Sequence, residues 1–262
     1  MANSDPGRTG MVLRMEHASI YDGEGIRTVV FLKGCPLRCR WCSTPESQSP
    51  AVQCAAGTTY GRELTAEQVF HEIRKDELFF FHSGGGVTFS GGEPLDQWEF
   101  VADVLARCRR LGIGTAIETS LYAPWEHIEP LLPLLDLIYA DLKAWDAVAH
   151  RELTGVDNGL IRDNITRIDG WLGDRRLILR TPIVPGVNDA PESLLGSARF
   201  CAGLTQLRYW EWLPYHRLGL DTYRKLGLTY ALPEVKAPTR DYLEERAGRL
   251  RQEVPGVRIS IR

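Results

Sequence analysis

Hydrophobic and polar residues alternate along the chain with the period of a β-strand in some segments and that of an α-helix in others. The segments between such changes are the expected strands and helices. Residues 11–18 and 26–33 are short β-type runs around a turn-forming stretch, which is typical of an antiparallel pair of strands. Residues 43–61 are rich in Ser, Pro, Gly and Ala, so we expect a loop there. Thr65 then supplies an N-cap for a helix that should end near Lys75.

From residue 86 onward, short apolar runs alternate with amphipathic stretches of helical period. The expected strands are 86–90, 114–119, 137–141, 177–182, 207–213 and 257–261, and the expected helices are 97–111, 124–135, 146–153, 160–172, 190–203 and 239–253. Such alternation requires a parallel sheet with right-handed crossovers and helices packed outside it. The pattern therefore predicts an α/β fold, a partly or fully closed β/α barrel preceded by a β extension.

Composition and charge narrow the class of protein. The chain has 262 residues, of which 44% are hydrophobic and 25% charged, as in a globular protein with a substantial core. A formal net charge of -3 gives no basic footprint for nucleic acid, and no apolar run is long enough for a membrane helix. Residues 1–10 lack the apolar centre of a signal peptide, so we expect a cytoplasmic protein. We expect this N-terminus to be disordered or extended, and residues 11–262 to form one domain.

Three of the six cysteines lie within eight residues, as Cys35, Cys39 and Cys42, directly after an apolar run. Free cysteine in protein cores is usually dispersed, so this cluster indicates chemistry. A structural zinc site would need a fourth ligand, and covalently attached haem would need a histidine after the third cysteine. A redox-active pair of Cys39 and Cys42 would leave Cys35 without a role. An iron–sulfur cluster of four irons held by three thiolates accounts for all three, and it leaves one iron open to a substrate. A zinc-binding interaction module is the non-enzymatic alternative.

Polar or Gly-rich groups follow nearly every expected strand. In barrels of parallel strands, the chemistry lies at the carboxyl ends of the strands. Here those ends carry the cysteine loop, 90–93, 118–119, 141–143, Arg180 and 213–216. An unpaired guanidinium at the end of an apolar strand would be costly, so we expect Arg180 to face the site.

The C-x3-C-x2-C spacing, placed after the first barrel strand, resembles the radical S-adenosylmethionine (radical SAM) superfamily. Five further segments between residues 20 and 230 resemble its glycyl-radical enzyme activating enzymes, of which the pyruvate formate-lyase activases are the best known. They read DGEGIRT at 22–28, GGVTFSGGEPL at 85–95, YADLK at 139–143, RTPIVPGVND at 180–189 and LPYHRLG at 213–219. The resemblance implies a partial (β/α)6 TIM-like radical SAM barrel with an N-terminal β extension.

The resemblance also implies an activity, namely an oxidoreductase similar to the [formate-C-acetyltransferase]-activating enzyme. One [4Fe-4S] cluster with an open iron would bind S-adenosylmethionine, whose reductive cleavage gives methionine and a 5′-deoxyadenosyl radical. That radical would abstract a Cα hydrogen from a glycine in the C-terminal loop of a partner glycyl-radical enzyme, in an anaerobic cell. Flavodoxin or ferredoxin would supply the electron, and the chain would act as a monomer with no nucleic acid or membrane partner.

The resemblance implies roles for individual residues at the strand ends. The catalytic set would be Cys35, Cys39, Cys42, Lys143 and Arg180, with the cysteines as cluster ligands and Lys143 facing the carboxylate of S-adenosylmethionine. The cofactor-binding set would add Trp41, Ser43, Gly91, Gly92, Glu93, Glu118, Asp141, Leu142 and His216. Within it, Glu93 would accept a hydrogen bond from the methionine ammonium. By sequence alone the two glycines favour a tight turn, and the resemblance implies that they let the backbone approach the ligand.

The remaining members of this set have more local roles. Trp41 and Ser43 would pack the adenine, and His216 would contact the nucleoside or the incoming peptide. Glu118 and Asp141 would help to bind a monovalent cation.

The chain departs from the family in two places. Residues 42–65 are short and contain Cys54 as their one further cysteine, so we expect no ferredoxin-like insert and only one cluster. We expect Cys108 and Cys201 to be helix-packing thiols. Residues 43–46 and 118–121 also differ from the commoner family forms.

Two readings of the substrate stay open. A radical SAM enzyme acting on a small molecule, similar to 7-carboxy-7-deazaguanine synthases, is the alternative to an activase. A barrel mouth sealed by its own loops would favour the small molecule, and a groove open to a peptide would favour the activase. Within the activases, the TGVDN segment at 154–158 is closer to a dehydratase-type group than to the pyruvate formate-lyase activases.

Overall fold

The computed structural model describes residues 7–171, 173–174 and 176–262, and the chain divides into two compact units. Unit 1 consists of Met1–Pro36, Thr44–Thr119 and Ala123–Ile138, and unit 2 of Leu37–Ser43, Ser120–Tyr122 and Tyr139–Arg262. The cysteine loop therefore contributes Cys35 to unit 1 and the other two cysteines to unit 2. The expected disordered or extended N-terminus lies largely outside the described residues, and residues 9 and 10 already belong to the first strand.

Unit 1 contains a mixed sheet with the strand order β5-β1-β2-β6-β7. Its strands are β1 (Thr9–Ser19), β2 (Arg27–Leu32), β5 (Arg62–Thr65), β6 (Gly86–Gly91) and β7 (Gly114–Thr119). β1 pairs antiparallel with β2 and β5, whereas β2, β6 and β7 are parallel neighbours. The expected antiparallel pair and the start of the parallel sheet are thus confirmed, and β5 is an additional strand.

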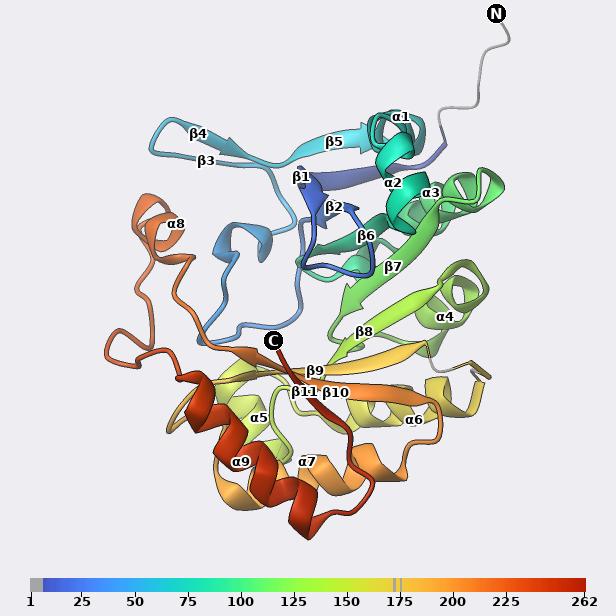
Figure 1. Ribbon diagram of the computed structural model, residues 1–262. Coiled ribbons are helices and arrows are strands. Elements are labelled where there is room, and N and C mark those ends of the chain that lie inside the picture. Colours follow the sequence, from blue (N-terminus) through green and yellow to red (C-terminus); the bar gives the residue numbers. More distant parts are fainter. Residues whose placement is uncertain (1–6, 172, 175) are drawn as a thin grey trace, which may run out of the picture. The chain divides into compact units, whose positions relative to one another are not determined.

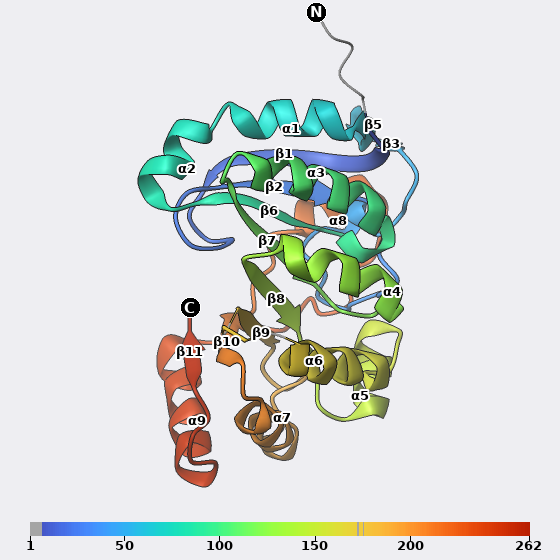
Figure 2. The same ribbon diagram turned by 90° about the vertical axis from the view of Figure 1, so that its right-hand side faces the viewer.

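Helices of unit 1 pack on this sheet, and α1 contacts α3 (Figure 2). They are α1 (Ala66–Arg74), α2 (Glu77–Ser83), η2 (Pro94–Gln97), α3 (Trp98–Arg110), α4 (Trp125–Ile128) and η3 (Glu129–Leu134). At the start of α1, Thr65 and Gln68 form the expected cap as a reciprocal capping box. The single helix expected over 124–135 is instead α4 followed by a 3-10 turn, because Pro130 and Pro133 lack the N–H that an α-helix needs.

The segment expected to be a loop, 43–61, is more ordered than its composition suggests. It contains η1 (Pro45–Ser47) and a separate hairpin of β3 (Gln53–Ala55) and β4 (Thr58–Tyr60). Ala56 and Gly57 both have positive φ at its turn, and Ala-Gly is a weaker turn signal than Asn-Gly. Buried Lys33 holds the segment, since its Nζ donates to the Glu46 carbonyl (2.5 Å) and to Gln53 Oε1 (3.1 Å).

Unit 2 contains the strand order β8-β9-β10-β11, in which β9, β10 and β11 are parallel. The strands are β8 (Leu137–Asp141), β9 (Leu177–Ile183), β10 (Leu207–Pro214) and β11 (Ile259–Ile261). The helices are α5 (Ala147–Thr154), α6 (Gly159–Trp171), α7 (Pro191–Gly203), α8 (Leu220–Lys225) and α9 (Arg240–Glu253). In Figure 1, α5, α6, α7 and α9 lie on the same side of β9 and β10.

The expected parallel strands and the outer helices of unit 2 are confirmed, and α8 is an additional helix. β9 is buried along almost its whole length, as a parallel strand covered on both faces should be. The expected end of the α6 helix, Leu172, lies outside the described residues. No helix in the described part of the chain has the length and hydropathy to span a membrane.

Asp136 fastens the start of β7, and its titration offers a test of unit 1. Its Oδ2 accepts from the amide (2.8 Å) and the hydroxyl (2.9 Å) of Thr115, and its Oδ1 accepts from Arg109 (2.8 Å). Burial alone would raise the pKa of Asp136, but these donors outweigh it and lower the pKa. The stabilisation is therefore present above the unfolded pKa of about 3.9, and it is lost as the pH falls through the lower folded pKa.

We expect Asp136→Asn to reduce the free energy of unfolding at pH 7, because it weakens the bonds to Thr115 and Arg109. The loss should be only about 1 kcal/mol, because the side chain is half exposed to solvent. The difference from the unaltered protein should begin to shrink below about pH 4, where Asp136 of the unfolded chain takes up a proton, and it should vanish below the lower folded pKa. Urea unfolding at several pH values measures both, with Asp163→Asn on the exposed face of α6 as the control. A difference that stays constant down to pH 3 would contradict the assignment.

Candidate active site

Cys35 follows β2 and is held by the backbone of the segment after the cysteine loop. The amide of Gly34 donates to the Ser47 carbonyl (2.8 Å), and the amide of Cys35 donates to the Gln48 carbonyl (3.2 Å). Two successive backbone hydrogen bonds fix the direction in which the chain leaves the strand. The first cysteine therefore starts from a defined position in unit 1.

Gly91 and Gly92 pack directly against the backbone of this strand end. The amide of Gly92 donates to the Leu32 carbonyl (2.9 Å), and the amide of Glu93 donates to the Gly34 carbonyl (2.7 Å). A Cβ on Gly92 would collide with the Gly34 carbonyl, and Gly91 has a φ of +107°. Both positions thus need glycine for the chain's own packing, whatever ligand approaches them. Their contact with S-adenosylmethionine stays a prediction.

The carboxylates at the ends of β6 and β7 both have protein partners. Glu93 is 1% exposed, and its Oε1 accepts from the Thr119 hydroxyl (2.6 Å) and the Leu95 amide (3.1 Å). Glu118 accepts from the Ser90 hydroxyl (2.7 Å). These bonds fix the carboxylates in place. Because the two strands are parallel neighbours, unit 1 brings the two groups to the same edge of its sheet.

In unit 2, the middle of the cysteine loop is bound to the end of α5. The amide of Arg38 donates to the Thr154 carbonyl (2.6 Å), and the amide of Arg40 donates to the Leu153 carbonyl (3.0 Å). The last carbonyls of a helix have no partner within the helix, so they are available to the loop. The amide of Cys42 donates to the Cys39 carbonyl (3.1 Å), which closes the turn between the second and third cysteines.

Burial raises the pKa of the Cys39 thiol to about 12, although the positive charge of Lys143 opposes this. The thiol would then stay protonated at neutral pH without a metal, and binding to iron would release its proton. The Lys143 charge is placed to favour that deprotonation.

Trp41 lies in an apolar cluster behind the loop and is 7% exposed. Its neighbours in the cluster are Ala144, Leu153, Val184, Tyr215 and Leu232. The Trp41 side chain therefore anchors the loop, and its predicted packing on adenine stays untested. Ser43 is exposed, and its carbonyl would be 2.6 Å from a Cβ at Gly219, so the chain after β10 passes close behind it.

The groups at the ends of β8 and β9 are paired with one another. Lys143 Nζ lies 2.8 Å from Asp141 Oδ2, and the Leu142 amide donates to the Arg180 carbonyl (2.9 Å). Arg180 donates to Glu211 Oε2 (2.6 Å) and stacks on the ring of Tyr139 at 3.6 Å. Unit 2 thus brings Asp141, Leu142, Lys143 and Arg180 together.

The structure gives Arg180 a partner that the sequence prediction did not include. Arg180 is 5% exposed and Glu211 is 8% exposed, so the guanidinium is buried but paired. Glu211 is the one acidic residue of β10, where it stands between Trp210 and Trp212, and it lies beside Arg180 in the strand register. That position within an apolar run was the signal that could have identified it. Whether Arg180 also contacts S-adenosylmethionine stays a prediction.

The end of β10 places His216 on the surface of unit 2. The His216 side chain is exposed, and its Nδ1 accepts from the amide of Leu218 (3.4 Å). This arrangement leaves the ring accessible to an incoming molecule. Its predicted contact with the nucleoside or with a peptide stays untested.

The donor set fits an iron–sulfur cluster better than a single metal ion. The six cysteines form no disulfide, and Cys54 is exposed while Cys108 and Cys201 are buried, as expected of packing thiols for the last two. Among the described residues, no three His, Cys, Asp or Glu side chains converge on a point that could hold one metal ion. A cubane cluster has a different requirement, since each thiolate binds a separate iron. The three cysteines of the loop therefore meet the chemistry of a [4Fe-4S] cluster with one open iron.

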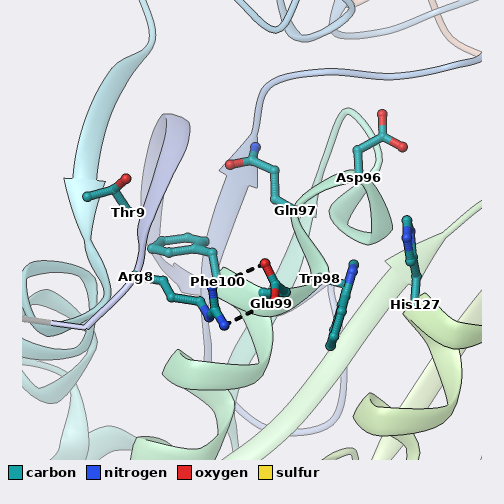
Figure 3. A pocket seen from close by; sticks show the side chains of 8 residues that line it. All are labelled: Arg8, Thr9, Asp96, Gln97, Trp98, Glu99, Phe100 and His127. Atoms are coloured by element: carbon teal, nitrogen blue, oxygen red, sulfur yellow. Dashed lines mark hydrogen bonds and ion pairs between the residues drawn. The ribbon is translucent and has the colours of Figure 1, made fainter.

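A cavity elsewhere in unit 1 is lined by none of the predicted site residues (Figure 3). It has a volume of about 440 Å³ and lies between the start of β1, the start of α3 and α4. Arg8 forms an ion pair with Glu99 (3.0 Å) on its wall, and the rings of Trp98 and His127 stack at 5.7 Å. The cavity is lined mainly by paired charges and aromatic rings, and it contains none of the cysteines. We therefore do not assign it to the chemistry of the cysteine loop.

Sequence reasoning missed the residues that shape α5 beneath the loop. His150 is fully buried, and its Nδ1 lies 2.6 Å from the Val156 carbonyl and 3.0 Å from the Thr154 hydroxyl. Asn158 donates to the carbonyls of Ala144 (2.9 Å) and Trp145 (2.7 Å). In the sequence, Thr154 and Asn158 belong only to the TGVDN segment. In the structure, the Thr154 carbonyl binds the cysteine loop, and Asn158 holds the chain that leads from β8 to α5.

We expect Glu211→Leu to lower the free energy of unfolding by about 3 kcal/mol or more, because it leaves the buried Arg180 charge without its carboxylate. Replacing both partners, Arg180→Met with Glu211→Leu, should recover a large part of that loss. Anaerobic urea unfolding of the two single variants and the double variant measures the coupling. Glu245→Leu, which breaks the exposed pair with Arg249, is the matched control and should have little effect. Additive losses in the double variant would contradict the pairing.

Comparisons with known proteins agree with this geometry. The sequence profile of the radical SAM superfamily matches residues 29–196. The chain is 35% identical to the isethionate sulfite-lyase activating enzyme of Oleidesulfovibrio alaskensis, over 88% of this chain and 91% of that protein. It is also 35% identical to the (2S)-3-sulfopropanediol dehydratase activating enzyme of Klebsiella oxytoca, over 89% and 90%. The pyruvate formate-lyase 2-activating enzyme of Escherichia coli is again 35% identical, over 90% of each chain.

Solved structures support the same fold. A domain of a pyruvate-formate lyase-activating enzyme from Bacteroides vulgatus has a TM-score of 0.56 and 30% identity, over 68% of this chain and 99% of that chain. SuiB of Streptococcus suis, with a TM-score of 0.65 and 16% identity over 89% of this chain and 48% of that chain, is similar in fold alone. The partial TIM-like barrel expected from the sequence is thereby confirmed. The chain belongs to the radical SAM superfamily and, within it, to the activating enzymes of glycyl-radical enzymes.

Proposed function

We propose that this activase installs the glycyl radical on a partner enzyme of the lyase or dehydratase type. The observation that carries the proposal is the cysteine loop, which has three free thiols and a backbone bound to the end of α5. When bound, a [4Fe-4S] cluster supplies the electron that cleaves S-adenosylmethionine to methionine and a 5′-deoxyadenosyl radical. The radical takes the Cα hydrogen of a glycine, which leaves 5′-deoxyadenosine and a glycyl radical.

The chain's own residues bind and orient S-adenosylmethionine in this proposal. Cys35, Cys39 and Cys42 hold the cluster. Lys143 faces the carboxylate of S-adenosylmethionine, and its ion pair with Asp141 (2.8 Å) keeps the ammonium group in position before the ligand arrives. Glu93 accepts from the methionine ammonium, with its carboxylate oriented by the Thr119 hydroxyl (2.6 Å).

The other predicted contacts follow from where their side chains are held. Arg180 is locked by Glu211 on one side and by the Tyr139 ring on the other, so it presents a fixed positive charge. Such a charge costs no reorganisation when an anionic ligand binds. Ser43 and Trp41 lie beside the third cysteine, where the resemblance locates the adenine. Leu142 is buried, and its amide donates to the Arg180 carbonyl, which fixes the backbone between Asp141 and Lys143.

The chain's contribution to hydrogen abstraction is positional. A glycine Cα–H has no acid or base that could be tuned, so the rate depends on how closely it is held to the radical carbon. His216 is exposed at the end of β10, and we assign it to the incoming glycine loop of the partner. The C-terminal glycine loop of the partner enzyme is a short peptide. The exposed His216 side chain is accessible to such a peptide.

The class of partner follows from the relatives and from one segment of this chain. One relative activates an isethionate sulfite-lyase and another a (2S)-3-sulfopropanediol dehydratase. The TGVDN segment at 154–158 is more similar to the dehydratase-type group than to the pyruvate formate-lyase activases, and it includes the carbonyl that binds the cysteine loop. We therefore assign the partner to the glycyl-radical enzymes that eliminate a substituent from a small substrate.

Several further points belong to the proposal. Flavodoxin or ferredoxin donates the electron, and the activase acts as a monomer with a single cluster. A monovalent cation binds with the help of Glu118 and Asp141, as the resemblance implies. Thiolate ligands need a reducing compartment, so we assign the enzyme to the cytoplasm of an anaerobic cell.

Anaerobic mixing with a candidate glycyl-radical lyase tests the function directly. With S-adenosylmethionine and a reductant, we expect a glycyl-radical doublet in the electron paramagnetic resonance spectrum of the partner and one 5′-deoxyadenosine per radical. Formation of 5′-deoxyadenosine with a small molecule, but no doublet on any lyase, dehydratase or pyruvate formate-lyase partner, would overturn the proposal.

We expect Cys35→Ser, Cys39→Ser and Cys42→Ser each to abolish radical formation, because a hydroxyl does not replace a thiolate on iron. Iron and sulfide content after anaerobic reconstitution should fall with activity. Cys54→Ser is the matched control, since Cys54 is exposed on the β3–β4 hairpin, and it should keep both the cluster and the activity. A loop variant that retained full activity would remove that cysteine from the ligand set.

A further inference from the structure

The surface of unit 2 around the cysteine loop is basic, although the chain as a whole is acidic. Residues 37–43 and 214–238 hold six basic and two acidic residues, in a chain with a formal net charge of -3. All six basic side chains are exposed, and we refer to them as the basic surface: Arg38, Arg40, Arg217, Arg224, Lys225 and Lys236. The two acidic residues are Asp221 and Glu234.

The two segments lie against each other, so these charges belong to one surface. Gly219 packs on the loop, where a Cβ would lie 2.6 Å from the Ser43 carbonyl and 3.2 Å from the Cys42 carbonyl. α8 begins at the next residue and carries Arg224 and Lys225. Glycine at this position is what permits the close approach, because any side chain would push α8 away from the loop.

The remainder of the second segment folds back onto the exit of β10. The guanidinium of Arg217 donates to the Pro233 carbonyl (2.7 Å), and the hydroxyls of Tyr215 and Tyr230 are 2.7 Å apart. Leu232 lies in the same apolar cluster as Trp41, directly behind the cysteine loop. The segment is therefore fixed, and its charges keep a defined position relative to Cys39 and Cys42.

Two large apolar side chains are exposed in the segment 214–238, namely Leu218 and, at 47%, Leu228. Leu218 lies between Arg217 and Gly219 and is 81% exposed. A protruding apolar residue with charged residues around it is the usual composition of a transient protein interface.

We propose that the basic surface is the docking site of the electron donor, a small acidic one-electron protein of the flavodoxin or ferredoxin class. Arg38 and Arg40 are exposed and are the chain neighbours of Cys39, so a protein bound to them lies close to a cluster ligand. Positive charge steers an acidic partner and raises its rate of association. One electron leaves the donor, which is oxidised by one equivalent, and reduces the cluster by one equivalent; no bond forms or breaks at the surface.

This inference rests on the proposed function, and charge reversal tests it. The variants are Arg40→Glu, Arg224→Glu and Lys236→Glu, with Arg249→Glu on the exposed face of α9 as the matched control. Anaerobic stopped-flow absorbance follows reduction by a bacterial flavodoxin hydroquinone or by photoreduced 5-deazariboflavin, which is small and uncharged. Isothermal titration calorimetry with oxidised flavodoxin measures binding independently of activity.

We expect each reversal to slow reduction by flavodoxin about tenfold at low ionic strength. The difference in rate from the unaltered protein should decrease as added salt screens the charges. Calorimetry should show correspondingly weaker binding. Reduction by 5-deazariboflavin and the iron content should stay unchanged, as should every property of Arg249→Glu.

Three outcomes would overturn the docking site. Equal slowing with both reductants would show damage to the loop, and no slowing with flavodoxin would place the donor elsewhere. Slower glycyl-radical formation with 5-deazariboflavin at unchanged cluster reduction would assign the surface to the glycyl-radical enzyme. The proposed function fails separately, if unaltered protein reduced by 5-deazariboflavin forms no glycyl radical on its partners.

Discussion

The cysteine loop has no regular structure of its own, so neighbouring backbone must hold it, and the rest of the site depends on that support. Unpaired amides inside a protein are costly, and the loop avoids the cost through carbonyls that other elements leave unused. In unit 2 these are the last carbonyls of α5, at Leu153 and Thr154. In unit 1 the chain after the loop supplies them, at Ser47 and Gln48. The thiols are therefore placed by hydrogen bonds to the backbone on either side of them.

Several of the family signatures serve this packing as much as they serve a ligand. Gly92 meets the Gly34 carbonyl, and Gly219 meets the carbonyls of the third cysteine turn, so neither position has room for a side chain. The DGEGIRT stretch acts at the other end of β2. There Arg27, 4% exposed, donates to the Thr88 hydroxyl (3.0 Å), which donates in turn to the Asp22 carbonyl (2.6 Å). This stretch fastens the entry to the strand that carries the first cysteine.

Charges near the predicted ligand contacts are arranged in pairs before any ligand binds. Lys143 is held by Asp141, and Arg180 by Glu211, the latter pair almost completely buried. Such pairs contribute little net stability, because desolvation offsets their attraction. Their effect is to fix where positive charge lies, which matters for orienting an anionic group. Exposed Arg38 and Arg40 instead act at longer range, where screening by salt decides their strength.

The sequence by itself determined where the parallel strands lie along the chain and the nature of the chemistry. Buried strands appear in the sequence as apolar runs, and the cysteine spacing is compatible with few kinds of metal or redox site. Both signals lie within short segments, so they can be recognised without the fold. Pro130 and Pro133 show where hydrophobic periodicity fails as a predictor. The amphipathic pattern continues through these residues, but their missing N–H groups prevent a continuous α-helix. Only the tertiary structure paired Arg180 with Glu211, 31 residues away, or set Gly219 behind the third cysteine. Such pairings depend on strand register and on backbone approach, which no local pattern encodes.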